Sequence, residues 1–199
     1  MNPKFIFRSA FLISAALLGG LSVSAQERPI TAASHEATLY VVVGSDEPSQ
    51  GNELPRGLDS VSKQIRETFQ FRNYRLINTY YGRLADSGSL EYKSVSSTKM
   101  GTDLDSPSFL DWQLARFQAN SASNNSLSVE MFRFGARVPV STKLPGKTDV
   151  SVPVTNYESV GLTLNKLSLE QGRPTLIGTI SLPRTSGTIF LIMTINPVS

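Results

Sequence analysis

The spacing of apolar residues predicts one helix in this chain. Four apolar residues recur at positions i, i+3, i+7 and i+11: Leu58, Val61, Ile65 and Phe69. On an α-helix this spacing places all four side chains on one face. We therefore expect a helix over Leu58–Phe69 whose apolar stripe packs against the rest of the domain.

Most of the remaining chain has the pattern of β-strands. About eight segments alternate apolar and polar residues or are apolar throughout: Glu36–Val43, Phe71–Leu84, Ser89–Ser97, Phe109–Ala119, Leu127–Val140, Val160–Leu169, Thr175–Leu182 and Thr188–Ile195. The continuous apolar runs in Glu36–Val43 and Thr188–Ile195 predict strands that are buried on both faces. Phe109–Ala119 also fits a helical period, so a helix is the alternative there.

Two of the strand patterns change face partway along. In Leu127–Val140 the apolar positions shift by one residue at Phe132, with Gly135 close by. In Val160–Leu169 the same shift follows Asn165 and Lys166. A change of face inside a strand is typical of a β-bulge, and we expect one in each segment.

The connections between the segments predict the fold class. The turn residues of Ala85–Gly88 predict a hairpin between Phe71–Leu84 and Ser89–Ser97. Such short connections favour antiparallel pairing. A mostly antiparallel sheet of about eight strands with one helix packed on one face is an α+β fold. A β-sandwich with a side helix is the alternative.

The N-terminal residues predict export. Lys4 and Arg8 precede the apolar run Ser9–Leu21, which is shorter than the ~20 residues that a membrane-spanning helix needs. Small residues at Val23-Ser24-Ala25 then resemble a signal-peptidase cleavage site. We expect residues 1–25 to be a signal peptide and residues 26–199 to form a single α+β domain that is periplasmic or extracellular, with no transmembrane helix. An uncleaved membrane anchor is the alternative for the first segment.

Charge and composition narrow the functional classes. The chain has 19 Lys and Arg residues against 16 Asp and Glu, and removal of Lys4 and Arg8 leaves 17 against 16, a net charge of +1. That balance does not favour a nucleic-acid partner. With no cysteine, the chain has no disulfide, thiol nucleophile or cysteine metal site. The single histidine, His35, lies beside a segment expected to be poorly ordered, and we interpret it as an incidental polar residue.

A search for catalytic motifs assigns no catalytic, cofactor-binding or metal-binding residue. The turn after the first strand, Gly44–Glu53, lacks a phosphate-binding motif, and Asp46 and Glu47 would repel phosphate. Asp103 and Asp105 could both reach one cation, although calcium prefers six to eight oxygen ligands. The favoured interpretations are a solvated acidic turn for the first segment and an ordinary polar loop for the second.

Aromatic and basic residues gather between the predicted helix and the strand after it: Phe69, Phe71, Tyr74, Tyr80 and Tyr81 beside Arg66, Arg72, Arg75 and Arg83. One interpretation is a surface for single-stranded nucleic acid or glycan. The favoured interpretation is that the aromatic residues fill the core and the arginines face solvent. Strand alternation predicts that Tyr74, Leu76 and Tyr80 share a face.

Two stretches resemble parts of bacterial secretins. Residues 57–79 (GLDSVSKQIRETFQFRNYRLINT) are similar to the small helix-then-strand modules at the periplasmic end of these proteins. Residues 167–198 resemble the end of the secretin β-domain, with a Gly172-Arg173-Pro174 turn and a last apolar strand over Ile189–Ile195. Secretins carry Gly-Gly where this chain has Gly178-Thr179, and they are much longer. The resemblance implies a short stand-alone envelope protein rather than a channel, and it implies no catalytic residues.

Three functional classes are compatible with these observations. The first is an exported, non-enzymatic binding or assembly module of the bacterial cell envelope that binds another envelope protein or itself. The resemblance implies that such a module would be related to secretins. Its signature would be an unpaired edge strand or an exposed apolar patch. The alternatives are a β-rich module that binds a glycan or another ligand, as in adhesion, and a hydrolase without a recognisable motif.

Overall fold

The computed structural model describes residues 34–47, 54–100, 106–119, 125–144 and 152–198, which form eight strands, one α-helix and one 3-10 turn. The strands are β1 (His35–Ser45), β2 (Asn73–Leu84), β3 (Leu90–Ser96), β4 (Ser108–Ala119), β5 (Ser126–Leu144), β6 (Val152–Glu170), β7 (Thr175–Ser181) and β8 (Thr188–Pro197). The 3-10 turn η1 (Arg56–Leu58) leads directly into the helix α1 (Asp59–Thr68).

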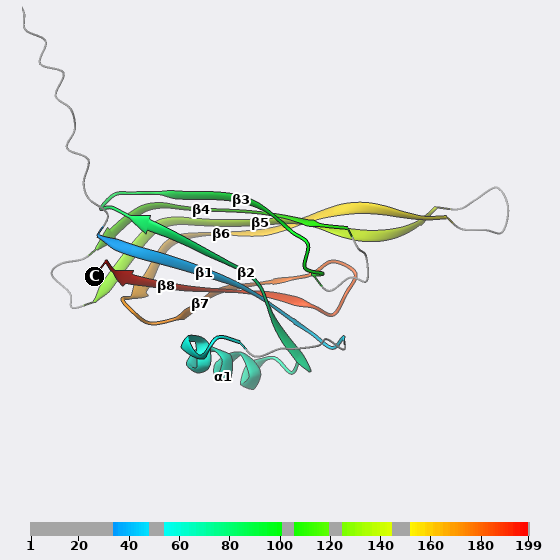
Figure 1. Cartoon of the computed structure of the whole chain (residues 1–199), viewed down its shortest axis with the longest axis horizontal. Helices are drawn as coiled ribbons and strands as arrows, with labels where there is room; N and C mark the ends of the chain where they lie inside the picture. The colour runs from blue at the N-terminus through cyan, green and yellow to red at the C-terminus, as the bar shows by residue number, and fades with distance from the viewer. Residues whose placement is uncertain (1–33, 48–53, 101–105, 120–124, 145–151, 199) are drawn as a thin grey trace, which may run out of the picture. The chain divides into compact units, whose positions relative to one another are not determined.

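The strands form two four-stranded sheets with antiparallel pairing throughout. Sheet A has the order β2-β1-β8-β7, and sheet B has the order β3-β4-β5-β6. Sheet B covers one face of sheet A, and α1 lies against the other face (Figure 1). The predicted α+β class, mostly antiparallel sheet with one helix on one face, is confirmed, and the two facing sheets have the sandwich arrangement given as its alternative.

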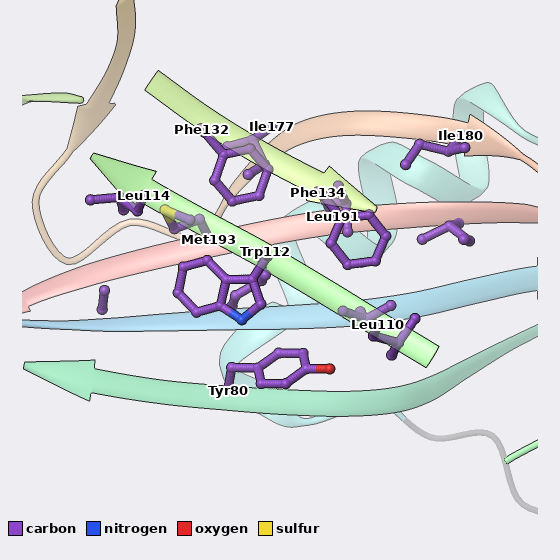
Figure 2. Close-up of a cluster of buried hydrophobic side chains, with 14 of the residues drawn as sticks. Tyr80, Leu110, Trp112, Leu114, Phe132, Phe134, Ile177, Ile180, Leu191 and Met193 are labelled. Atoms are coloured by element: carbon purple, nitrogen blue, oxygen red, sulfur yellow. The ribbon is translucent and has the colours of Figure 1, made fainter. Parts of the chain in front are cut away.

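The main core lies between the two sheets and is centred on Trp112 of β4. Its indole stacks on Tyr92 with 5.1 Å between ring centroids and meets Tyr80 and Phe132 at 5.9 and 6.2 Å. Leu191 of β8 faces it from sheet A (Figure 2). Side chains from both sheets therefore form one continuous apolar layer, which is where most of the hydrophobic stabilisation arises.

A second, smaller core lies between α1 and sheet A. Leu58, Val61 and Ile65 pack against a sheet face that includes Tyr74 and Phe190. The predicted helical stripe is thus confirmed, but both ends of the helix differ. The chain enters α1 through the 3-10 turn, and Phe69 follows the helix in an extended conformation. The Tyr74 hydroxyl donates to the backbone carbonyl of Phe69 just after the helix. Burial raises the pKa of Tyr74 above its ordinary value.

The predicted hairpin around Ala85–Gly88 is wrong, because β2 and β3 belong to different sheets. The turn carries the chain from sheet A to sheet B, and its backbone bonds to β4. The amide of Ser87 donates to the carbonyl of Phe117 at 2.7 Å, and the amide of Phe117 donates to the carbonyl of Gly88 at 3.1 Å. The turn residues predicted a hairpin between β2 and β3. Backbone hydrogen bonds to β4 instead hold the turn at sheet B, where β3 pairs with β4.

The prediction that Tyr74, Leu76 and Tyr80 share a face is also wrong. Val41 pairs with Asn78 and Val42 pairs with Leu76, so Ile77 is an extra residue in β2. Such a bulge reverses which side chains point to each face. Tyr74 therefore packs under α1, whereas Tyr80 lies in the core between the sheets.

The changes of face in β5 and β6 occur as predicted, but without a bulge. Phe132 and Val129 of β5 are both buried, yet the register with β4 and with β6 is continuous past this point. β4, β5 and β6 all change face at the same level of sheet B, at the neighbouring residues Arg116, Glu130 and Lys166. We refer to these three residues as one row. Arg116 and Lys166 reach the left-handed region, with φ of 54° and 57°. Because neighbouring strands shift together, no strand needs an extra residue.

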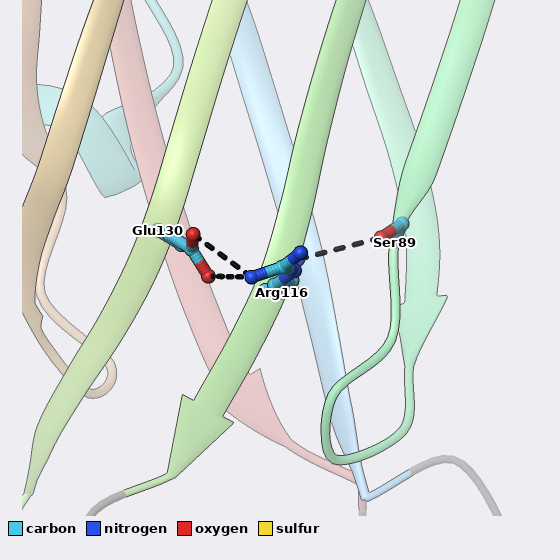
Figure 3. A network of polar contacts seen from close by, with 3 residues as sticks. All are labelled: Ser89, Arg116 and Glu130. Atoms are coloured by element: carbon cyan, nitrogen blue, oxygen red, sulfur yellow. Dashed lines mark hydrogen bonds and ion pairs between the residues drawn. The ribbon is translucent and has the colours of Figure 1, made fainter.

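The side chains of this row link the strands at the surface. Arg116 donates to both carboxylate oxygens of Glu130 at 3.0 and 2.8 Å, and its amide donates to the hydroxyl of Ser89 at 3.4 Å (Figure 3). The ion pair is exposed, so it contributes little to stability beyond orienting these two side chains.

Burial of the apolar stripe of α1 should hold the helix against sheet A. Ile65 is 1% exposed, and Ile65→Ala should lower the free energy of unfolding by about 3 kcal/mol because it leaves a cavity under α1. Gln64→Ala, at the next position on the exposed side, should change it by less than about 0.5 kcal/mol. Urea unfolding followed by circular dichroism measures both, and equal effects would contradict this placement of the helix.

Candidate functional site

The strongest candidate for a binding surface is the outer edge of β6. This strand of 19 residues ends sheet B, and among the described residues it pairs only with β5. In an antiparallel pair, alternate backbone groups of an edge strand point away from the sheet. β6 therefore presents an unpaired row of N–H and C=O groups.

The side chains of β6 that point into the sandwich are incompletely covered. Val160, Leu162, Leu164 and Leu167 pack on the main core but are only partly buried. On the neighbouring strand β5, Phe132 and Phe134 are fully buried. The apolar layer between the sheets thus reaches solvent at β6.

The two flanks of the sandwich differ. On the β2–β3 flank, the hydroxyl of Tyr92 donates to the carbonyl of Tyr81 at 2.6 Å, and the Tyr80 and Ser94 hydroxyls lie 2.5 Å apart. On the β6–β7 flank, Leu162 lies against Gly178, where an added Cβ would be 2.6 Å from a Leu162 methyl carbon. Polar contacts close the first flank, whereas an apolar contact covers the second.

β5 and β6 continue beyond the rest of sheet B as a two-stranded arm. The last β4 partner of β5 is Phe109, opposite Arg137, but β5 and β6 remain paired as far as Leu144 and Val152. Figure 1 shows this ribbon extending past the other strands. Two-stranded ribbons are marginally stable by themselves, so the arm is a region that an added strand would stabilise.

Two features limit where a strand could add. Lys166 has a positive φ and interrupts the extended backbone. Glu158 accepts a hydrogen bond from Arg184 at 2.6 Å, and this pair lies in the middle of the edge. Charges at an edge strand are a common protection against unwanted pairing. The backbone at Lys166 and the Glu158–Arg184 pair therefore restrict where a further strand can pair with β6.

The structure gives His35 a structural place and corrects the expectation that it is incidental. His35 opens β1, is buried, and packs its ring 4.9 Å from that of Phe117. Its Nδ1 lies 2.8 Å from the hydroxyl of Ser34. The residues that the structure describes contain no group of three or more candidate metal ligands. Asp103 and Asp105 lie outside the described residues.

The acidic turn after β1 has a structural role in the described part of the chain. Asp46 accepts a hydrogen bond from the amide of Arg72 at 3.1 Å. The carbonyl of Glu47 accepts one from the side chain of Asn73 at 2.6 Å. These contacts fasten the end of β1 to the start of β2, as expected of an ordinary turn.

The aromatic and basic cluster is mainly a core feature, as favoured from the sequence. Tyr74 and Tyr80 are buried on opposite faces of sheet A. The Arg66 guanidinium lies over the Tyr74 ring at 4.6 Å and covers it from the solvent side. Tyr81 is the exception, since it is half exposed.

Comparisons with protein-family models, curated proteins and solved structures found no match to this chain. Within the described residues, no helix is long and apolar enough to span a membrane.

The coordinated change of face should depend on the backbone at Lys166. Valine at a positive φ is strained, so Lys166→Val should lower the free energy of unfolding by about 1–2 kcal/mol. Lys166→Gly should be tolerated, because glycine adopts this conformation freely. Thr163→Val, at an exposed position of the same strand, is the matched control and should be nearly neutral. Chemical unfolding of the three variants makes the comparison, and equal stabilities for the Val and Gly variants at 166 would contradict it.

Proposed function

We propose that this chain is an exported, non-enzymatic binding or assembly module of the bacterial cell envelope that takes its partner by strand addition at β6. The observation that carries the proposal is the outer edge of β6, which has no partner strand in the described structure. Strand addition uses main-chain hydrogen bonds for affinity and alternate side chains for specificity.

An added strand would also remove apolar surface from water. Its inward side chains would lie beside the half-buried Val160, Leu162 and Leu164 and bury the apolar surface that these residues still expose. Each Å² of apolar surface buried in this way contributes about 25 cal/mol, before the loss of freedom on association is subtracted. The edge therefore offers both polar and apolar contacts to one extended segment.

The partner is another envelope protein or a second copy of this chain. The apolar part of β6 is self-complementary: antiparallel pairing of two copies about Leu162 would place Val160 opposite Leu164. Apolar pairs directly across a ladder are favourable. An interface of this kind is isologous, as in most homodimers.

Export is part of the proposal and rests on the signal-peptide pattern of residues 1–25. The chain would then act in the periplasm or outside the cell. A relationship to secretins remains a prediction carried by the resemblance of residues 57–79 and 167–198. It fits an assembly role and overlaps β6 only at Leu167–Glu170.

Site-specific photo-crosslinking in the native envelope tests the proposal. Probes at Thr155 and Asn165, both exposed on β6, should each give a discrete adduct with one partner or with a second copy. A probe at Lys63, exposed on α1, is the control and should not give that adduct. Recovery of the protein alone and soluble from every β6 probe would contradict the proposal.

Substitution of Leu162 gives a second test of the same edge. A lysine that points inward at an edge strand opposes strand addition, so Leu162→Lys should abolish the β6 adduct. Leu162→Met preserves apolar character and should retain it. Melting temperatures of the purified variants check that both are folded. Equal adduct yields from two folded variants would contradict strand addition.

A further inference from the structure

The outer face of sheet B, which points away from sheet A, is hollowed over all four of its strands. Two adjoining depressions of about 590 and 440 Å³ share Asp111, Arg133 and Arg137. One extends over β3 and the other over β6, and we refer to the two together as the outer-face hollow. It is distinct from the edge of β6, so this inference does not depend on the proposed function.

Two glycines form the floor of the outer-face hollow. Gly135 of β5 and Gly161 of β6 are directly paired, and both lie in the row that contains Asp111. A Cβ at Gly135 would lie 2.7 Å from a carboxylate oxygen of Asp111, and one at Gly161 would lie 2.5 Å from the carbonyl oxygen of Phe134. Contacts within sheet B therefore leave no room for a side chain at either position, and this part of the outer face stays low between its neighbours.

Cationic side chains flank this floor. Arg133 and Arg137 precede and follow Gly135 by two residues on β5, so both point to the outer face. Strand geometry places their Cα atoms about 13 Å apart. Both side chains are exposed, and neither forms a salt bridge with another described residue. The hollow thus presents two guanidinium groups to an anionic ligand, on either side of the Asp111 carboxylate, which lies over Gly135.

The polar groups between the arginines favour a ligand with hydroxyl groups. Asp111, Gln113 and Thr163 line the same hollow. A carboxylate at its centre would repel a continuous polyanion such as polyphosphate, but it accepts hydrogen bonds from hydroxyl groups. Arginine, in contrast, matches carboxylates with paired hydrogen bonds.

The arm end of the outer-face hollow is apolar. Val95 is 61% exposed there, and the rings of Phe109 and Tyr157 meet at 5.5 Å. The Arg137 guanidinium lies over the Phe109 ring at 4.8 Å, which fixes the arginine beside these rings. Binding sites for small organic groups combine apolar walls with a few placed polar groups in this way. The apolar face of a sugar ring fits such a wall.

We propose that the outer-face hollow binds a strand of an acidic polysaccharide, with its carboxylates on Arg133 and Arg137 and its hydroxyl groups on Asp111 and its polar neighbours. The sugar hydroxyl groups meet the Asp111 carboxylate above Gly135, and the apolar end receives one ring face. Charge complementarity selects carboxylate-bearing polymers over neutral ones, and Asp111 selects them over polyphosphate.

Binding of the purified protein to polygalacturonate at physiological ionic strength tests the proposal. Methyl-esterified polygalacturonate has the same sugar chain without the charges and should bind at least tenfold more weakly. Polyphosphate should also bind more weakly, by a similar factor. Equal affinity for the acid and ester forms would overturn the assignment of carboxylates to the arginines. Tighter binding of polyphosphate would overturn the choice of a glycan, and no binding of polygalacturonate would overturn the proposal.

Matched charge variants locate the site. The double variant Arg133→Gln and Arg137→Gln should lose at least tenfold in affinity for polygalacturonate. The double variant Arg56→Gln and Lys63→Gln removes the same charge from exposed positions of η1 and α1 and should keep the affinity within twofold. Equal losses from the two doubles would show attraction by net charge alone and overturn the site. Loss of binding in the first double with β6 crosslinks intact would separate this site from the proposed function.

Discussion

The fold depends on burying sheet A on both of its faces. In β8 the residues from Ile189 to Met193 are all fully buried, because their side chains point alternately to α1 and to sheet B. β1 lies beside β8 and shares this environment over Val41 and Val42. A strand with apolar residues on both faces requires a layer on each side. The helix and sheet B are the two layers that satisfy this requirement.

The sequence predicts the features that arise from local periodicity. The apolar runs of β1 and β8 predict two-sided burial, and the stripe from Leu58 to Ile65 predicts the helix. Pairings that depend on distant strands were not predictable in the same way. The turn Ala85–Gly88 leads into a different sheet because β4 takes its backbone hydrogen bonds. The pairing with partner strands also decides where bulges occur. β2 has a bulge at Ile77, whereas β5 has none near Gly135.

The candidate surfaces were harder to predict from sequence than the core. The predicted strands Leu127–Val140 and Val160–Leu169 are shorter than the observed ones, since β5 continues to Leu144 and β6 already begins at Val152. Only the assembled sheet shows that β6 is an edge and that Gly135 pairs with Gly161. The outer residues of β5 and β6 alternate with the core residues, so the packing that fixes Phe132 and Phe134 also positions Arg133 and Arg137.

In a single copy of the chain, β6 is an open edge on a sandwich whose stability is concentrated at β8 and β1. Amide hydrogen exchange, resolved by residue with NMR at a concentration where the purified protein is monomeric, tests this arrangement. We expect the amides of β8 and β1 to exchange slowest, and every second amide of β6 to exchange much faster than its neighbours, which bond to β5. Uniformly slow exchange along β6 of the monomer, equal to that of β8, would show that this edge is covered within the chain and would rule out an open edge.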